Sequence, residues 1–353
     1  MDVPTVPLVR ALHQGRLHQA KARWFHEPAL PCPQRDDVAL LQYTGGTTGL
    51  SKGAMLTHGN LLANLAQIAE ITRVHLRPGR ETVLTVLPLY HVIAFTINLL
   101  FGFHSGSTNV LIPNPRPLRN LKAALRKHRI TWMTAVNTLL KALPEEPWFK
   151  PEWVRDLRAA FAGGMATHPD VRERWERLTG CTVIEGYGLS EASPLVTFNP
   201  HTERDGRIVR TLPRVGGVGL PLPGTEVRLV DAQGRTVPPG THGEILVRGP
   251  QVMRGYWNQP EETARVLRDG WLHTGDIGCF DEDGYLEITD RKKDMILVSG
   301  FNVFPNEVEA CLLQHPDVAD VAVIGVPDES TGESVHAHVV RRHPHLTAKE
   351  LRA

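Results

Sequence analysis

Residues 43–53 concentrate the residue types that bind phosphate. The segment reads Tyr-Thr-Gly-Gly-Thr-Thr-Gly-Leu-Ser-Lys-Gly, with four glycines, three threonines and one lysine. Glycine lets backbone N–H groups approach an anion closely, threonine hydroxyls donate to phosphate oxygens, and lysine supplies positive charge. An apolar, strand-like run precedes the segment at 38–43, and residues 56–65 read as the start of a helix. We predict a phosphate-binding loop, with a Gly/Thr surface turn as the alternative.

The Walker spacing G-x-x-x-x-G-K-[ST] does not fit this loop. Counting five residues on from Gly46 reaches Ser51 instead of a glycine, and Lys52 is followed by Gly53 instead of Ser or Thr. The segment is therefore a phosphate loop of another class. Its candidate ligands are Thr44, Gly45, Gly46, Thr47, Thr48, Gly49 and Lys52.

A second candidate site is residues 185–191, Glu-Gly-Tyr-Gly-Leu-Ser-Glu, which follow a strand-like run. Two glycines bracket an aromatic ring, Tyr187, that can stack on a base. Glu191 follows four residues later, and magnesium favours one or two carboxylates together with substrate phosphates. Glu191 is thus a candidate magnesium ligand. A Gly-Tyr-Gly turn with a solvated glutamate is the structural alternative.

Bulk properties narrow the class of protein. The 353 residues suggest roughly two or three domains. The formal net charge of +1 gives no indication of a nucleic-acid partner. The longest apolar stretch, 92–103, is too short to span a bilayer, and the first 25 residues show no signal peptide. Scattered cysteines argue against a zinc site or a disulfide framework and suit a reducing compartment. They are Cys32, Cys181, Cys279 and Cys311.

Alternating short β-branched runs and helical stretches must position these motifs. The strand candidates are 38–43, 82–87, 107–112, 131–136, 157–162 and 181–185, with helices at 118–128 and 169–179. This order predicts an α/β fold with a mostly parallel, covered sheet. Short alternating strands at 215–290 predict a small antiparallel β unit, and the residues after it an α+β piece. We therefore expect four segments: 1–35, which carries little signal, 36–214, 215–290 and 291–353.

The motifs together resemble those of the adenylate-forming superfamily, which includes acyl-CoA synthetases, luciferases and the adenylation domains of peptide synthetases. The family's phosphate loop is Tyr-Thr-Ser-Gly-Thr-Thr-Gly-x-Pro-Lys-Gly. Gly45 here replaces the serine, Ser51 replaces the proline, and the other fixed positions match. The resemblance continues through four further motifs and spans nearly the whole chain.

The resemblance implies roles in nucleotide binding. The family motif Gly-Tyr-Gly-x-Thr-Glu places the aromatic ring on adenine and the acid on Mg²⁺, which implies these roles for Tyr187 and Glu191. Ser190 replaces the usual threonine and keeps the hydroxyl. A glycine-rich segment that lines adenine in the family matches residues 162–165, with Ala162 in place of its first glycine. The implied nucleotide contacts are Gly163, Gly164, Met165, Glu185, Gly186, Tyr187, Gly188 and Ser190.

Two later motifs imply contacts to ribose and to coenzyme A. Asp276 ends the eight-residue match 269–276 and would accept hydrogen bonds from the ribose hydroxyls, although a lone aspartate is usually a turn former. Arg291 would approach ribose and phosphate, and Lys293 would be the hinge of the small domain. Read without the resemblance, these two cations form a solvated turn. Ser299 and Gly300 would lie beside the pantetheine path, where glycine leaves room.

A fifth motif, 88–92, places His91 at the head of the apolar stretch. In the family this histidine lies beside the carboxylate and the acyl group, but a cap or core role is as consistent with the residues. Phe95 occupies the position where long-chain members place an aromatic residue at the mouth of the acyl tunnel. The apolar residues after it suit an alkyl chain and suit an ordinary core equally well.

Residues 290–307 look like bacterial long-chain-fatty-acid–CoA ligases nearly residue for residue. The resemblance implies an acid–thiol ligase with Mg²⁺ as cofactor and ATP and CoA as co-substrates. A fatty carboxylate would attack the α-phosphorus of ATP, and CoA would then displace AMP. Positioning and electrostatics would carry catalysis, with Lys52, His91, Glu191 and Lys293 as the candidate catalytic residues. An aryl- or medium-chain acyl-CoA ligase, or a non-catalytic remnant that binds nucleotide or acyl groups, are the alternatives.

The chain is short for this family. Its phosphate loop begins at residue 43, where the family has a further α/β lobe before the loop, and it stops at Ala353, before a terminal lysine that serves adenylation. The expectation is a ligase shortened at both ends, whose own activity stays open. We expect a cytoplasmic location, with peripheral contact with the inner membrane face kept open. Acyl chain length and oligomeric state also stay open.

Overall fold

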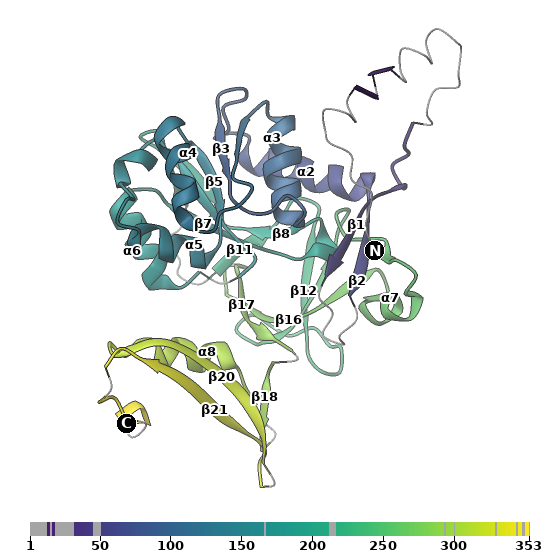
Figure 1. Ribbon diagram of the computed structural model, residues 1–353. Helices are drawn as coiled ribbons and strands as arrows, with labels where there is room; N and C mark the ends of the chain where they lie inside the picture. Colours follow the sequence, from purple (N-terminus) through teal and green to yellow (C-terminus); the bar gives the residue numbers. More distant parts are fainter. Residues whose placement is uncertain are drawn as a thin grey trace.

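The computed structural model shows a large body followed by a smaller one (Figure 1). The larger body runs from β1 to β17, and the smaller one contains β18 to β21 and helix α8. The described residues are 13–14, 16–17, 32–44, 51–165, 167–211, 217–292, 294–299, 301–328, 330–343, 345–347 and 350–352. Among these residues, no helix is long and apolar enough to cross a lipid bilayer.

Five parallel strands form one half of the main sheet, in the order β4-β3-β5-β6-β7. Their bounds are β3 Thr82–Thr85, β4 Thr108–Leu111, β5 Trp132–Ala135, β6 Ala159–Ala162 and β7 Val183–Gly188. Each corresponds to a strand predicted from the sequence. Neighbouring residues of β5 face opposite sides, since Met133 packs with one buried cluster and Trp132 with another. The sheet is thus covered on both faces, and the predicted α/β class is confirmed.

Helices between these strands pack on the face that Met133 lines. Helix α6 (Pro169–Thr179) begins with proline at its first turn and ends at Gly180, which adopts a left-handed conformation (φ 65°). Its buried residues include Val171 and Trp175. The other elements here are α4 Lys122–Lys127, α5 Asn137–Ala142, η2 Leu118–Leu121, η3 Leu143–Glu145 and η4 Pro151–Val154.

The second half of the main sheet is antiparallel and continues from β7 without a break. Strand β11 (Gly217–Pro221) pairs with β8 (Leu195–Phe198) on one side and with β17 (Leu286–Arg291) on the other. The predicted small antiparallel unit is therefore hydrogen-bonded to the parallel half, in one twelve-stranded sheet. The remaining strands are β12 Glu226–Val230, β13 Gly243–Arg248, β15 Leu267–Arg268 and β16 Trp271–Phe280, and η5 (Ser190–Ala192) precedes β8. The four-segment division remains a prediction.

The phosphate-loop motif lies between two antiparallel strands. Thr44 at the end of β1 (Val38–Thr44) pairs with Lys52 at the start of β2 (Lys52–Thr57). Helix α2 (His58–Thr72) begins only after β2, because Thr57 and Asn60 cap it through reciprocal hydrogen bonds of 3.0 and 3.1 Å. The expected helix start near residue 56 was therefore slightly early. Strand β14 (Gly255–Tyr256) adds to the other edge of β2, and α7 (Pro260–Val266) follows it.

The apolar stretch after His91 is helical but wound as a π-helix. This helix, η1, spans Ala94–Leu100 and is followed by α3 (Phe101–His104). Two of its polar residues are buried. Thr96 donates to the Ser193 carbonyl at 2.8 Å, and Asn98 bonds with the hydroxyls of Thr85 and Thr134 at 3.1 and 2.9 Å. These hydrogen bonds satisfy both polar side chains within an apolar stretch.

The smaller body is a four-stranded sheet in the order β19-β18-β21-β20, with α8 against β20. Near its junction with the large body, the Asn306 amide donates to the Asp290 carboxylate at 3.1 Å, and Phe304 stacks on His242. Its elements are β18 Ile296–Val298, β19 Phe301–Val303, α8 Pro305–Leu312, β20 Val318–Asp328, β21 Gly332–Arg341 and η6 Glu350–Arg352. A separate hairpin joins β9 (His201–Arg204) to β10 (Arg207–Arg210).

Candidate functional site

Residues 253–257 join the phosphate-loop motif to the Glu191 motif. The Met253 amide donates to the Glu191 carbonyl at 2.7 Å, and the Trp257 amide donates to the Gly53 carbonyl at 2.8 Å. Between these bonds, Tyr256 pairs with Ala54 across β14 and β2. The segment thereby brings two motifs that are far apart in the sequence to one place.

The side chain of Tyr256 lies between Glu191 and Lys52. Its hydroxyl donates to Glu191 Oε1 at 2.8 Å, and Lys52 Nζ lies 5.5 Å from the ring centroid, within cation–π range. Burial, together with the adjacent Glu191, raises the pKa of Tyr256, so the phenol stays protonated and keeps donating. Tyr256 therefore orients the carboxylate that the sequence suggested as a magnesium ligand.

Lys52 also forms an ion pair with helix α7. Its Nζ lies 2.5 Å from Glu262 Oε2, and the two side chains are only 13% and 22% exposed. The hydrogen bond from Lys52 lowers the pKa of Glu262, so this carboxylate is ionised at neutral pH. The candidate phosphate-binding cation thus has a carboxylate partner in this structure.

Tyr187, Asp276 and Arg291 meet at the junction of the two halves of the main sheet. The Tyr187 hydroxyl donates to Asp276 Oδ2 at 2.6 Å, and Arg291 Nε lies 3.6 Å from Asp276 Oδ1. The pairing of β16 with β17 places Asp276 opposite Arg291. Burial raises the pKa of Asp276, while the Tyr187 hydrogen bond and the Arg291 charge oppose that rise. Three residues predicted to contact the nucleoside are therefore neighbours.

The glycines beside Tyr187 permit close strand packing. A Cβ on Gly188 would lie 2.2 Å from the Pro194 carbonyl oxygen, and one on Gly186 would lie 2.9 Å from that of Thr197. Both contacts are backbone atoms that cannot move aside, so β7 approaches the chain entering β8 closely only with glycine here. The sequence suggested base stacking for this motif, and strand packing is a further reason for its glycines.

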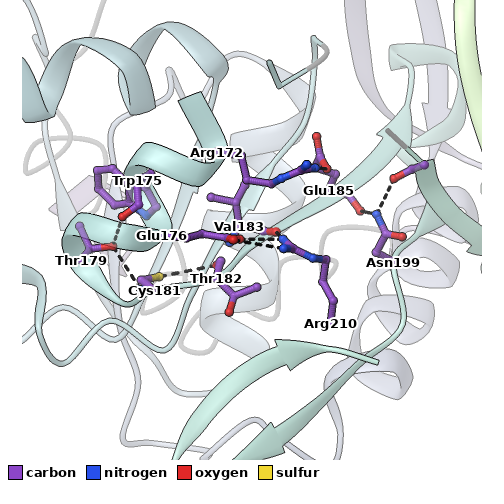
Figure 2. A network of polar contacts seen from close by, with 11 residues as sticks. Arg172, Trp175, Glu176, Thr179, Cys181, Thr182, Val183, Glu185, Asn199 and Arg210 are labelled. Atoms are coloured by element: carbon purple, nitrogen blue, oxygen red, sulfur yellow. Dashed lines mark hydrogen bonds and ion pairs between the residues drawn. The ribbon is translucent and has the colours of Figure 1, made fainter. Parts of the chain in front are cut away.

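Glu185, the first residue of the same motif, is committed to an ion pair in the structure. Figure 2 shows its carboxylate facing Arg172 of α6, with Arg172 donating to Glu185 Oε2 at 3.0 Å. A neighbouring fork joins Arg210 to Glu176 at 2.7 and 3.1 Å, and Glu176 also accepts the Val183 amide. Burial raises the pKa of Glu185 despite Arg172. The network holds α6 against β7, and nucleotide contact by Glu185 stays a prediction.

His91 and Phe95 lie at the start of the apolar stretch. His91 is exposed and its Nδ1 accepts the Ile93 amide at 3.4 Å, while partial burial lowers the pKa of the imidazole. Phe95 is half-buried and packs against the hydrophobic cluster that contains Tyr187 and Tyr256. A Cβ on Gly164 would lie 3.3 Å from the Ile93 side chain, so the glycine-rich segment borders the same place.

The remaining predicted residues fall into two groups. Among those described, the Thr44 carbonyl accepts from the Ser51 hydroxyl at 3.1 Å, Met165 is half-exposed, and the Ser299 amide donates to the Thr331 carbonyl at 2.7 Å. Gly163 directly follows β6, and Ser190 begins η5. Outside the described residues lie Gly45, Gly46, Thr47, Thr48, Gly49, Lys293 and Gly300. The sequence analysis missed Tyr256, Glu262 and Arg172, because their partners are distant in the chain and no local pattern marks them.

Glu191 is the metal-ligand candidate of this site. Within the described ranges, no group of three or more His, Cys, Asp or Glu side chains is arranged to hold a metal ion. A single oriented carboxylate matches magnesium bound mainly by substrate phosphates and water, and differs from an all-protein cage.

Comparison with known proteins identifies two matching families. Residues 3–257 match the family described as AMP-binding enzyme, and residues 307–353 match the AMP-binding enzyme C-terminal domain. A curated relative named long-chain-fatty-acid–CoA ligase, from Escherichia coli O6:H1, is 50% identical over 338 residues. The alignment covers 96% of this chain and 58% of that relative, so the chain spans little more than half the relative's length.

Two solved structures share the fold. ATP-bound MatB from Rhodopseudomonas palustris is 34% identical with a TM-score of 0.80, covering 92% of this chain and 62% of that one. O-succinylbenzoate coenzyme A synthetase (MenE) from Bacillus subtilis, in complex with ATP and a magnesium ion, is 30% identical with a TM-score of 0.77. The alignment with MenE covers 92% of this chain and 65% of that one.

Proposed function

This chain belongs to the AMP-binding enzyme family, and from that premise we propose that it ligates a long-chain fatty acid to coenzyme A at the expense of ATP. The observation that carries the proposal is the meeting of Lys52 and Glu191 on Tyr256, beside the pair Tyr187–Asp276. The proposed substrate class rests on the 50% identity to the relative named long-chain-fatty-acid–CoA ligase. Acyl-adenylate is the proposed intermediate, with pyrophosphate and then AMP as products.

Each residue of the site has a proposed task in the first step. Asp276 accepts the ribose hydroxyls, and Tyr187, whose phenol stays protonated because burial raises its pKa, holds that carboxylate in place. Lys52 and the phosphate loop bind the polyphosphate, which aligns the α-phosphorus with the attacking fatty carboxylate. Fixed donors and charges stabilise the negative charge that develops, so no protein nucleophile is required.

We further propose that Glu191 contributes to a magnesium site. Tyr256 occupies one carboxylate oxygen of Glu191, which leaves the other oxygen to coordinate a cation whose remaining ligands are phosphate oxygens and water. When bound, magnesium neutralises part of the polyphosphate charge. Tyr256 contributes by keeping Glu191 turned toward Lys52.

The acyl group is proposed to enter past His91 and Phe95. Below the π-helix, an apolar cavity of about 50 Å³ lies between η1 and the sheet, lined by Ile97, Phe101 and Leu195 among others. Neither His91 nor Phe95 lines this cavity, so the proposed alkyl path rests on the apolar packing of Phe95, where each buried methylene would contribute roughly 0.8 kcal/mol. The aryl- or medium-chain alternative would bury fewer methylenes along the same path.

Isotope exchange between pyrophosphate and ATP tests this proposal. We expect exchange that depends on palmitate and magnesium and is much weaker with acetate or benzoate, because a longer alkyl chain buries more methylenes. Faster exchange with benzoate than with palmitate would contradict the long-chain proposal and favour an aryl acid as the substrate. ATP binding with no exchange for any acid would favour a nucleotide-binding protein without adenylation activity.

We also propose peripheral contact with an anionic membrane surface through η2 and α4. No aspartate or glutamate occurs between Thr82 and Pro144, whereas arginine and lysine recur. Arg119, Lys122 and Lys127 are exposed on the η2–α4 segment and have no ion pair within the described part of the chain. A shallow groove along this segment is lined by Lys127 and by Leu111, which is half-exposed. Cations over an apolar groove fit anionic phospholipid.

Vesicle sedimentation tests this surface. The triple variant Arg119→Glu, Lys122→Glu, Lys127→Glu should lose binding to phosphatidylglycerol-containing vesicles, since each basic residue contributes about 1 kcal/mol near an anionic surface. A matched variant, Arg80→Glu, Arg177→Glu, Arg204→Glu, changes the same charge at other exposed positions and should bind as the parent does. If both variants lost vesicle binding equally, the loss would come from net charge and not from this surface. If the parent bound neutral vesicles as well as anionic ones, the contact would not be electrostatic.

A further inference from the structure

Glu262 forms an ion pair with Lys52, the cation that the sequence predicts to bind phosphate. The two atoms Nζ and Oε2 are 2.5 Å apart, and both side chains are largely buried. Glu262 comes from α7, which lies beside β2 because β14 pairs with that strand (Figure 1). This contact joins residues 210 positions apart and belongs to none of the sequence motifs.

Both oxygens of the Glu262 carboxylate are engaged. Lys52 takes Oε2, and Arg265, one turn further along α7, donates to Oε1. Arg265 is largely exposed, whereas Lys52 is not. If Lys52 moved away, Arg265 would still neutralise Glu262, so separating the first pair would leave no isolated carboxylate.

Lys52 likewise keeps an attractive partner without Glu262. Its ammonium group lies 5.5 Å from the Tyr256 ring, and Tyr256 binds Glu191. An ammonium group has three donors but only one charge, and a carboxylate beside it repels an incoming phosphate. Phosphate and Glu262 must therefore compete for Lys52.

We propose that Glu262 is a latch on Lys52: it pairs with the lysine in the free protein, and a nucleotide polyphosphate binds by taking its place. The inference rests on the proposed function, in which Lys52 binds phosphate. Glu262 acts through Lys52 and touches no reacting atom, so it is a positioning residue. Its presence lowers affinity for ATP and for pyrophosphate and so eases the release of pyrophosphate after adenylation.

Direct binding of ATP to Glu262→Gln tests the latch. The variant keeps the shape of the side chain and removes its charge, and ATP and pyrophosphate should each bind about tenfold more tightly, the effect of one charged hydrogen bond. Adenosine, which has no phosphate, should bind unchanged. Glu262→Asp, which retains the carboxylate, should stay near the parent affinity.

Glu261→Gln is the matched control. Glu261 is the preceding residue of the same helix and is exposed, so its replacement removes the same charge without touching Lys52. Tighter ATP binding of equal size in both variants would overturn the latch in favour of a general charge effect. Weaker ATP binding by Glu262→Gln would also overturn it, since Glu262 would then assist Lys52.

Lys52→Ala separates failure of the latch from failure of the proposed function. If Lys52→Ala weakens ATP binding while Glu262→Gln and Glu261→Gln behave alike, the latch is wrong and the phosphate role of Lys52 stands. If Lys52→Ala leaves ATP affinity unchanged, the phosphate role itself is wrong. Because Lys52 keeps the Tyr256 ring as a partner, the unfolding midpoints of the Glu262 variants should stay close to the parent's. A merely structural ion pair would instead change the midpoint and leave the ratio of ATP to adenosine affinity unchanged.

Discussion

Replacement of Lys52 by alanine should weaken ATP binding by about 1–3 kcal/mol, that is roughly five- to 150-fold in Kd. The ammonium group emerges from β2 directly after the loop, in a largely buried position where charge is poorly screened. Charge-assisted hydrogen bonds to phosphate are among the stronger polar contacts in proteins. Titration calorimetry with ATP and with adenosine measures the change, which should appear for ATP alone.

Lys122→Ala is the control for this change. Lys122 is an exposed cation of α4, so its removal lowers the net charge equally without altering the cluster around Tyr256. ATP affinity should stay at the parent value in this variant. If Lys52→Ala bound ATP as tightly as the parent, the proposed role of the phosphate loop would be wrong.

Replacement of Arg172 by methionine should cost about 3–5 kcal/mol of unfolding free energy, because it leaves the buried carboxylate of Glu185 without its partner. Arg172 and Glu185 are 3% and 11% exposed, and burial already raises the pKa of Glu185 in the intact pair. The double variant Arg172→Met, Glu185→Leu replaces both partners by apolar groups and should recover most of the loss. Urea denaturation measures all three proteins.

The loss in Arg172→Met should depend on pH. Without the arginine the pKa of Glu185 rises further above its unfolded value, so the folded state binds the proton more tightly than the unfolded state does. A carboxyl of this kind stabilises the fold at low pH, and that contribution disappears as pH rises through the folded pKa. The single variant should therefore be less destabilised at pH 5 than at pH 8.

Arg174→Met, on the same helix, provides the comparison. Arg174 pairs with Glu145, and these side chains are 44% and 54% exposed, so the variant should lose at most about 1 kcal/mol. Equal losses for the two arginines would show that α6 responds to any change of charge. The buried pair would then have no special role in holding β7 (Val183–Gly188).

Local pattern was sufficient to locate the strands and several helices of this chain. The five parallel strands appear where short strand-like runs were predicted. Helix α6 spans the predicted residues, because its proline start and glycine end are local signals. The phosphate-loop and Tyr187 motifs were found in the sequence from glycine, threonine and lysine at short spacing, and their binding roles stay predictions. Alternation of residues along a strand identifies its two faces, and this information is present in the sequence itself.

Only the tertiary structure decided which of these elements meet. Residues 52–57 became a strand because β1 and β14 pair with them, and β11 joined the antiparallel strands to the parallel half. Strand order and register placed Tyr256 on Glu191, 65 residues away, and Glu262 on Lys52, 210 residues away. A periodic pattern indicates which face of an element a side chain lies on, but it does not identify the strand or helix that packs against that face. The partners of Lys52, Glu185 and Glu191 therefore follow from long-range packing, which alone brings such residues within a few ångströms.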